Sequence, residues 1–330
     1  MLQYSNNSGC YSVRSIPSYR SNLSYHMLLC ASLLLGFVPL AFADTPKPAM
    51  PSSGTLYGSS TPYSAAFLDS EPLGSMQTST LSELSGLAAS NANPGLFWAH
   101  NDSGDSARVF LIDPLNGDIK LEVNLKGIEV YDCEDITMRT LPDGHYLVLG
   151  DIGDNRGVRD NLALHQFREP KLGEHKRMSI KNADIQTMTI SYEEGARDAE
   201  TLMSAPDGQL IIITKRETLN YYYQFRFEAS KTARLTSIAR IPIEDITAGD
   251  MRSNGELALR TYAQIYYWPT TKGNVANTLS NLTAERVLTA PEPQGEALAW
   301  GTDGSLLSIP EKPFMFSQVI TKYPRAAPEK

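Results

Sequence analysis

From Leu81 onward, the chain alternates short apolar runs with polar turns. The runs are rich in β-branched and aromatic residues, and Gly, Asp, Asn and Pro separate them. Almost no stretch keeps the 3.6-residue apolar period of an amphipathic helix. This pattern predicts an all-β domain made of short strands.

A short motif, a small or acidic dyad followed by apolar residues, recurs five times along this domain. The copies are Ser85-Gly86-Leu87, Glu134-Asp135-Ile136, Ala199-Glu200-Thr201, Gly249-Asp250-Met251 and Gly295-Glu296-Ala297. Compared at positions 86, 135, 200, 250 and 296, they are 49, 65, 50 and 46 residues apart. A repeat of this length is typical of a β-propeller blade.

Turn signals recur in the same phase as the dyads. Asp-Gly or Asn-Gly follows four of the dyads, at positions 143, 207, 254 and 303, and an apolar run follows each turn. These dipeptides supply the backbone angles of tight hairpins. A third run is visible in several units, for example at residues 109–112 and 264–268. Three to four strands per unit is the architecture of a propeller blade.

The number of blades follows from the length of the chain. Five units are detected, and a period of about 48 residues leaves room for a sixth. Pairing of residues 63–68 with the end of the chain would close that blade, so we expect six blades rather than five. We expect the charged insertion at residues 171–184 to form a long loop or an extra hairpin.

The N-terminal segment has the pattern of an export signal. Residues 27–42 are apolar apart from Pro39, and Ala41-Phe42-Ala43 has the small-x-small pattern of a signal peptidase site. We expect cleavage after Ala43, a Pro/Ser/Gly-rich linker over residues 44–78 and the propeller over residues 79–330. The protein would then be periplasmic or secreted, without a membrane span and monomeric.

Charge and cysteine content narrow the possible partners. The formal net charge of −8 argues against binding to nucleic acid or to an anionic membrane surface. Two of the three cysteines belong to the predicted leader, so the mature chain would have no internal disulfide. Cys133 lies between Asp132 and Glu134, and we expect it to be a small buried residue rather than a nucleophile.

Acidic residues gather at corresponding places in the repeats, at the start of a first strand or the end of a second. Because the first strands of a propeller line its central channel, these carboxylates would converge at the mouth of the channel. Oxygen-rich sites suit calcium or magnesium better than zinc. The candidate metal ligands are Asp102, Asp105, Glu134, Asp135, Asp151, Asp154, Asp198, Glu200 and Glu296. The same acids are also suited to cap turns and to bind neighbouring blades.

Basic residues share this phase and suggest a subsite for an anion. The candidates for binding a small anionic ligand are Arg197, Lys215 and Arg260, although these side chains could equally form ion pairs between blades. His100, Asp135 and Glu200 are the candidate catalytic groups. The motifs of serine hydrolases, zinc proteases, P-loop enzymes and dinucleotide-binding enzymes are absent from the sequence.

Five stretches carry a resemblance to known proteins. They are LSGLAAS…NPGLFWAHNDSGD, DCEDIT…YLVLGDIGDN, GARDAETLM…GQLIIITKRE, LALRTY and EPQGEALAW. From about Leu81 to Pro310, the chain resembles a group of largely uncharacterised bacterial secreted β-propeller proteins. More loosely, it looks like the calcium-dependent β-propeller phytases and the metal-dependent lactonases of the gluconolactonase type. That resemblance implies that the acids hold calcium and that Arg or Lys holds an anionic substrate.

Two functions therefore remain open. In the first, the central face binds a divalent cation and a small anionic ligand, and its enzymatic form is a phosphoester or lactone hydrolase. In the second, the propeller is a non-catalytic module that docks an envelope protein or a glycan, and the acids are structural. A cation that only stabilises the fold is a third reading.

Overall fold

The structure, a computed structural model, describes residues 61–77, 79–292, 294–311 and 317–327. All of them belong to the unit formed by residues 46–330. The predicted signal peptide and most of the predicted linker lie outside the described residues. No helix within the described ranges is long and apolar enough to cross a membrane.

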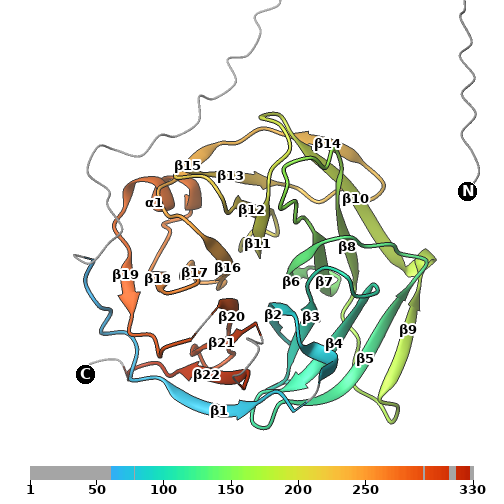
Figure 1. Ribbon diagram of the computed structural model, residues 1–330, viewed down its shortest axis with the longest axis horizontal. Coiled ribbons are helices and arrows are strands. Elements are labelled where there is room, and N and C mark those ends of the chain that lie inside the picture. Colours follow the sequence, from blue (N-terminus) through green and yellow to red (C-terminus); the bar gives the residue numbers. More distant parts are fainter. Residues whose placement is uncertain (1–60, 78, 293, 312–316, 328–330) are drawn as a thin grey trace, which may run out of the picture. The chain divides into compact units, whose positions relative to one another are not determined.

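The described residues form five β-sheets that are arranged as the blades of a propeller (Figure 1). Blade 1 consists of β2 (Leu84–Ala89), β3 (Phe97–Asn101), β4 (Arg108–Asp113), β5 (Asp118–Lys126) and β9 (Arg177–Lys181). Blade 2 consists of β6 (Cys133–Leu141), β7 (Gly144–Asp151), β8 (Leu162–Arg168), β10 (Ile185–Tyr192) and β14 (Thr232–Leu235). Blade 3 consists of β11 (Ala199–Ser204), β12 (Leu210–Thr214), β13 (Asn220–Phe225) and β15 (Ala239–Ile241).

The last two blades have four strands each. Blade 4 consists of β16 (Ile246–Met251), β17 (Leu257–Thr261), β18 (Ile265–Trp268) and β19 (Glu285–Val287), with the helix α1 (Val275–Asn281) between β18 and β19. Blade 5 consists of β20 (Gly295–Trp300), β21 (Leu306–Pro310), β22 (Val319–Tyr323) and β1 (Glu71–Ser75). Two short 3-10 helices lie at Ser79–Leu81 and Asn182–Asp184. The all-β propeller predicted from the sequence is confirmed.

The five first strands form the inner ring of the propeller. Each of β2, β6, β11, β16 and β20 contacts the next, and β20 contacts β2, so the ring closes (Figure 1). The turns between first and second strands use the predicted glycines. Gly208 and Gly304, for example, have φ angles of 77° and 81°, which a side chain would strain.

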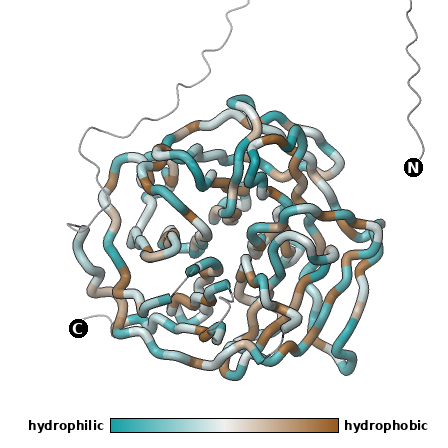
Figure 2. Tube along the Cα trace, viewed as in Figure 1, coloured by the Kyte–Doolittle hydropathy of each residue, from teal (hydrophilic) through white to brown (hydrophobic). Residues whose placement is uncertain are grey.

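The hydrophobic core lies between the blades rather than at the centre of the ring. Five clusters of buried side chains each fill the space between two neighbouring blades. Trp98 of blade 1 packs in one cluster with Ile136 of blade 2, and Trp300 of blade 5 packs in another with Tyr267 of blade 4. Apolar stretches accordingly lie within the blades in Figure 2. Each blade is therefore stabilised by both of its neighbours.

The described residues form five blades and no sixth, so the expected number of six was one too many for this part of the chain. The N-terminal segment supplies a strand to blade 5 instead, because β1 pairs antiparallel with β22. Before β1, Tyr63 bridges to Arg286 and Phe67 bridges to Arg325. The pairing of residues 63–68 with the end of the chain thus occurs in part, but it completes the fifth blade.

The extra length of the 65-residue repeat serves to connect blades. The insertion at residues 171–184 forms β9, which leaves blade 2 and pairs in parallel with β5 of blade 1. In the same way, β14 leaves blade 3 and pairs in parallel with β10 of blade 2. The expected loop or hairpin is therefore an edge strand of the preceding blade.

The buried carboxylate of Glu169 fixes the start of the segment that leaves blade 2 and forms β9. Glu169 accepts hydrogen bonds from Ser90 Oγ at 2.6 Å, Trp98 Nε1 at 2.9 Å and the backbone N–H groups of Asn91 and Ala92. All four donors belong to blade 1, whereas Glu169 follows the last residue of β8 in blade 2. This single side chain therefore joins two blades.

We expect Glu169→Ala to lower the free energy of unfolding by about 3 kcal/mol, because it leaves buried donors of blade 1 unsatisfied. Urea unfolding followed by tryptophan fluorescence measures this change. Glu174→Ala is the matched control, since Glu174 is an exposed acid of the same segment, which leads from β8 to β9. Equal losses in the two variants would contradict the anchoring role.

His165 should make the stability of the fold depend on pH. Burial lowers the pKa of His165 from 6.5 to about 4, while its Nδ1 lies 3.0 Å from Thr187 Oγ1. Below pH 6.5 the unfolded chain gains a proton that the folded chain does not, so stability is lost as the pH falls from 6.5 towards 4. Between pH 7.5 and pH 5, this loss is about 2 kcal/mol by proton linkage.

We therefore expect His165→Gln to reduce the fall in stability between pH 7.5 and pH 5 relative to the parent chain. Urea unfolding at the two pH values gives this difference directly. His145→Gln serves as the control, because His145 is exposed on the same blade. Parallel pH profiles of the parent and His165→Gln would show that the imidazole does not stay neutral in the folded protein.

Candidate functional site

The inner strand of every blade contains a β-bulge close to its first residue. At the bulge the register with the second strand shifts, and residues of the inner strand lose their partners across the ladder. These residues are Ser85 and Gly86 in blade 1, Glu134 in blade 2, Glu200 in blade 3, Thr247 in blade 4 and Glu296 in blade 5. A bulge re-aims the side chain that it carries. Ser85, Glu134, Glu200 and Glu296 all line one cavity.

This cavity, the central pocket, has a volume of about 110 Å³. Residues that follow the second strands complete its wall, so that all five blades contribute. They are Asp102 after β3, Asn155 after β7, Lys215 and Arg216 after β12, Tyr262 after β17 and Glu311 after β21. The pocket is almost entirely polar and accommodates a small group rather than a large molecule.

Two carboxylates of the pocket are buried without partners. Glu134 and Glu296 are 3% and 8% exposed, and neither side chain forms a hydrogen bond or an ion pair with any described residue. Gly153 allows this arrangement around Glu134, because a Cβ at position 153 would collide with the carboxylates of Glu134 and Asp132. A buried carboxylate without a partner is costly unless it is protonated or binds a cation.

Glu134 belongs to two groups of carboxylates. Asp102, Asp132 and Glu134 can offer oxygens that lie within 4.8 Å of one another, and Glu134, Asp198 and Glu200 can do the same. We call these the first triad and the second triad. Each has the size and the oxygen donors of a site for a hard divalent cation.

The two triads differ in their counter-charges. In the second triad, Glu200 binds Lys215, and Asp198 Oδ2 lies 2.6 Å from Arg216 Nε. In the first triad, no ion pair joins a carboxylate to a basic side chain within the described part of the chain. The first triad is therefore the more attractive site for a cation.

The protonation equilibria of the pocket reflect the excess of acids. Burial raises the pKa of Glu134 well above its usual value, and the neighbouring carboxylates of Glu200 and Asp102 raise it further. Burial is also the main reason that the pKa of Asp102 rises to about 6 and that of Glu296 to about 8. A cation held by Asp102 and Glu134 would lower the pKa values of these two ligands again, because it favours the ionised carboxylates.

Lys215 and Arg216 form the basic side of the pocket. Lys215 is 4% exposed, and its Nζ donates to Glu200 and, at 2.6 Å, to the hydroxyl of Tyr262. Arg216 donates from Nη2 to Asn155 and is half exposed at the mouth. These cations line the same pocket as Asp102 and Glu134 and can contact an anionic group of a ligand.

Asp135, a candidate metal ligand and catalytic group, lies outside the pocket. Its carboxylate accepts from the backbone N–H of Ile136 and, at 2.8 Å, from that of Leu202 in blade 3. Asp250 similarly accepts from the backbone N–H of Trp300 in the next blade at 2.8 Å. Both side chains hold neighbouring inner strands together, which is the structural alternative considered from the sequence.

Three further candidate ligands are engaged in loops. Asp151 accepts from two backbone N–H groups and pairs with Arg159 at 2.8 Å, and Asp154 accepts from the N–H groups of Val158 and Arg159. Asp105 pairs with Arg108 at 2.9 Å. None of the three lines the central pocket. Their oxygens shape the loops that carry the site.

The structure also separates His100 and two of the basic candidates from the pocket. Arg197 pairs with Glu217 at 2.7 Å, and Arg260 is 1% exposed and pairs with Glu292 at 2.8 Å. His100 is buried, its Nδ1 lies 2.8 Å from the carbonyl oxygen of Asn101, and burial lowers its pKa to about 4. Lys215 is therefore the predicted basic residue that reaches the pocket.

Tyr262 and Glu311 are pocket residues that the sequence patterns did not reveal. Each follows a second strand, but neither belongs to an acidic cluster or a dyad. Their positions directly after predicted second strands could have identified them, since the residues that follow the second strands meet at the central pocket. Asp132, which lies two residues before Glu134, is a member of the first triad that the predicted ligands do not include.

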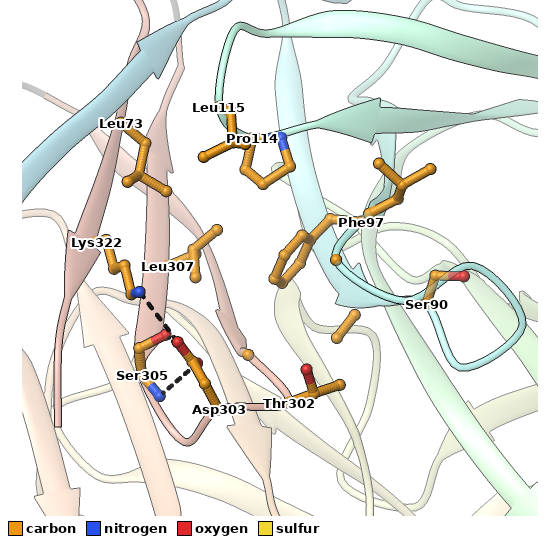
Figure 3. Close-up of a pocket in the computed structure, with 14 residues that line it drawn as sticks. Leu73, Ser90, Phe97, Pro114, Leu115, Thr302, Asp303, Ser305, Leu307 and Lys322 are labelled. Carbon is orange, nitrogen blue, oxygen red and sulfur yellow. Dashed lines mark hydrogen bonds and ion pairs between the residues drawn. The ribbon is translucent and has the colours of Figure 1, made fainter.

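A larger cavity of about 270 Å³ lies where blade 5 meets blade 1 (Figure 3). Leu73, Phe97, Leu115 and Leu307 make its walls mostly apolar, and Lys322 is paired with Asp303 at its edge at 3.0 Å. This cavity contains a single carboxylate that already has partners. The central pocket is the better candidate despite its smaller volume, because the carboxylates of Glu134 and Glu296 in its wall have no partner among the described residues.

Comparisons with known proteins leave the function open. No protein-family model and no curated protein matches this chain. Among solved structures, a gluconolactonase from Xanthomonas campestris shares 10% identity, with a TM-score of 0.46 over 86% of this chain and 99% of its own. A streptogramin B lyase shares 12% identity, with a TM-score of 0.41 over 80% of this chain and 100% of its own. Similarities at this level assign no function to this chain.

The contrast between Glu134 and Asp135 is testable in the metal-free protein. We expect Glu134→Gln to raise the free energy of unfolding by about 1 kcal/mol at pH 8, because burial raises the pKa of Glu134 and so penalises a carboxyl group that the unfolded chain ionises freely, whereas an amide carries no such penalty. Asp135→Asn should lower it by about 2 kcal/mol, because an amide cannot accept from both backbone N–H groups. Urea unfolding in the presence of a chelator measures both, and a loss of stability in Glu134→Gln would show that its carboxylate has a partner.

Proposed function

We propose that the central pocket binds a divalent cation, calcium or magnesium, together with a small anionic ligand. The observation that carries this proposal is the buried and unpartnered carboxylate of Glu134, which stands between two groups of acids. Asp102, Asp132 and Glu134 would hold the cation through their oxygens. Lys215, Arg216 and the hydroxyl of Tyr262 would contact the anion.

The enzymatic form of this proposal is a hydrolase that acts on a phosphoester or a lactone. The cation would supply polarisation of the ester oxygen and a more acidic water. On the protein side, Lys215 is held in place by Glu200 and Tyr262 and would stabilise the negative charge that develops on the reacting group. Glu296, with its pKa near 8, carries a proton around neutral pH that it can donate to a leaving oxygen.

Thermal melts test the cation site. After chelator treatment, calcium or magnesium added back should raise the melting temperature in a saturable manner, because the ion binds only the folded chain. Glu134→Gln should abolish this rise, whereas Asp154→Asn should preserve it, since Asp154 is an acid of the same face that lies outside the pocket. No ion-dependent shift in the parent chain would favour the non-catalytic interaction module.

The same variants separate binding from catalysis. The parent chain should hydrolyse a member of a phosphoester and lactone panel in the presence of the ion. Lys215→Met should lose this activity by at least a hundredfold, the typical cost of removing one group that stabilises developing charge, while keeping the ion-dependent melt. An ion-dependent melt without activity on the panel would restrict the proposal to binding.

A further inference from the structure

Strand β9 is the most exposed part of blade 1. It lies at the outer edge of the sheet (Figure 1), and four of its five residues are exposed on both faces, with Ile180 half-buried. The edge strands β14, β15 and β19 each contribute at least one buried residue. Burial of apolar surface therefore contributes little to the placement of β9, which rests mainly on its pairing with β5.

The free edge of β9 presents backbone groups in a defined order. The backbone N–H of Glu122 in β5 donates to the carbonyl oxygen of Lys176 at 2.9 Å. Because backbone groups alternate in direction along a strand, residues 176, 178 and 180 face β5. The N–H and C=O groups of Arg177, Ser179 and Lys181 then face outward, where the described sheet ends.

Basic side chains surround this edge. Lys176, Arg177 and Lys181 are exposed, and Lys126 of β5 is the register partner of Lys181. Glu122 is paired with Arg177 at 3.0 Å and offsets part of this charge. The chain as a whole is acidic, with a formal net charge of −8, so the edge has the opposite sign to the molecule that carries it.

The positive charge along the edge of β9 determines which kind of strand can pair with it. If a second copy of β9 paired antiparallel about Ser179, Arg177 of each copy would lie opposite Lys181 of the other. Like charges directly opposite each other destabilise a sheet. Pairing of β9 with a second copy of β9 is therefore disfavoured. An extended segment rich in Asp and Glu would instead form ion pairs in the same positions.

We propose that β9 is a docking edge for an extended acidic segment of a partner protein, which adds to blade 1 as a further strand. The outward backbone groups of Arg177, Ser179 and Lys181 hydrogen-bond the segment. The side chains of Arg177, Lys181 and Lys126 pair with its carboxylates. This mode of recognition combines strand addition with charge complementarity. It is independent of the central pocket.

A fluorescein-labelled octapeptide of alternating Glu and Thr is the probe, and its anisotropy is measured against the full chain. The signal should rise saturably at low salt and fall at 0.5 M NaCl. Arg177→Glu combined with Lys181→Glu should weaken binding at least tenfold. The double variant Lys231→Glu/Arg234→Glu, which reverses two exposed charges at β14, should bind as the parent does. No saturable binding by the parent chain would overturn the proposal.

Ser179→Pro tests the role of the backbone, because it removes one outward N–H while leaving every charge in place. Binding should fall at least tenfold, and Ser179→Ala should leave it unchanged; thermal melts confirm that both variants fold. Undiminished binding by a folded Ser179→Pro chain would show attraction by charge alone and would refute strand addition. Vesicles of anionic phospholipid that bind as tightly as the peptide would likewise refute a preference for a protein segment.

Discussion

The burial of like charges at the centre of the ring constrains the rest of the structure. Three of the β-bulges carry a glutamate whose side chain lines the central pocket. Glu134, Glu200 and Glu296 are brought together in this way, and Lys215 neutralises only Glu200 by a direct ion pair. The inter-blade core must hold these charges in place against their mutual repulsion, which the five apolar clusters achieve.

The blade architecture could be predicted because hairpin chemistry is local. Asp-Gly and Asn-Gly turns recur in phase with apolar runs, and the structure places a hairpin at each of them. The number of blades could not be predicted in the same way, since it depends on which distant segments pair. The pairing of β1 with β22 and of β9 with β5 involves residues far apart in the sequence, and no local pattern specifies it.

Part of the lining of the central pocket could be predicted from the sequence. The dyads led to Glu134, Glu200 and Glu296, which lie in the pocket, and to Asp250, which does not. In blade 4 the bulge falls at Thr247, three residues before Asp250, and the Thr247 hydroxyl donates to the carbonyl oxygen of Gly295. The sequence does not show which of these two positions carries the bulge, because Thr247 and Asp250 are both polar residues of the same short strand.

Strands β9 and β14 each leave one blade and pair with the preceding one, so neighbouring blades are not all joined in the same way. Strand β9 ties blade 2 to blade 1, and β14 ties blade 3 to blade 2, whereas blade 5 is completed by β1 from the other end of the described chain. Exchanged strands therefore join blades 1 to 3 to one another. Among the described strands none is exchanged between blades 3 and 4, between blades 4 and 5 or between blades 5 and 1. Slow opening motions of the ring would begin among the blades without an exchanged strand, and amide protons of β20 and β21 would exchange before those of β7 and β8.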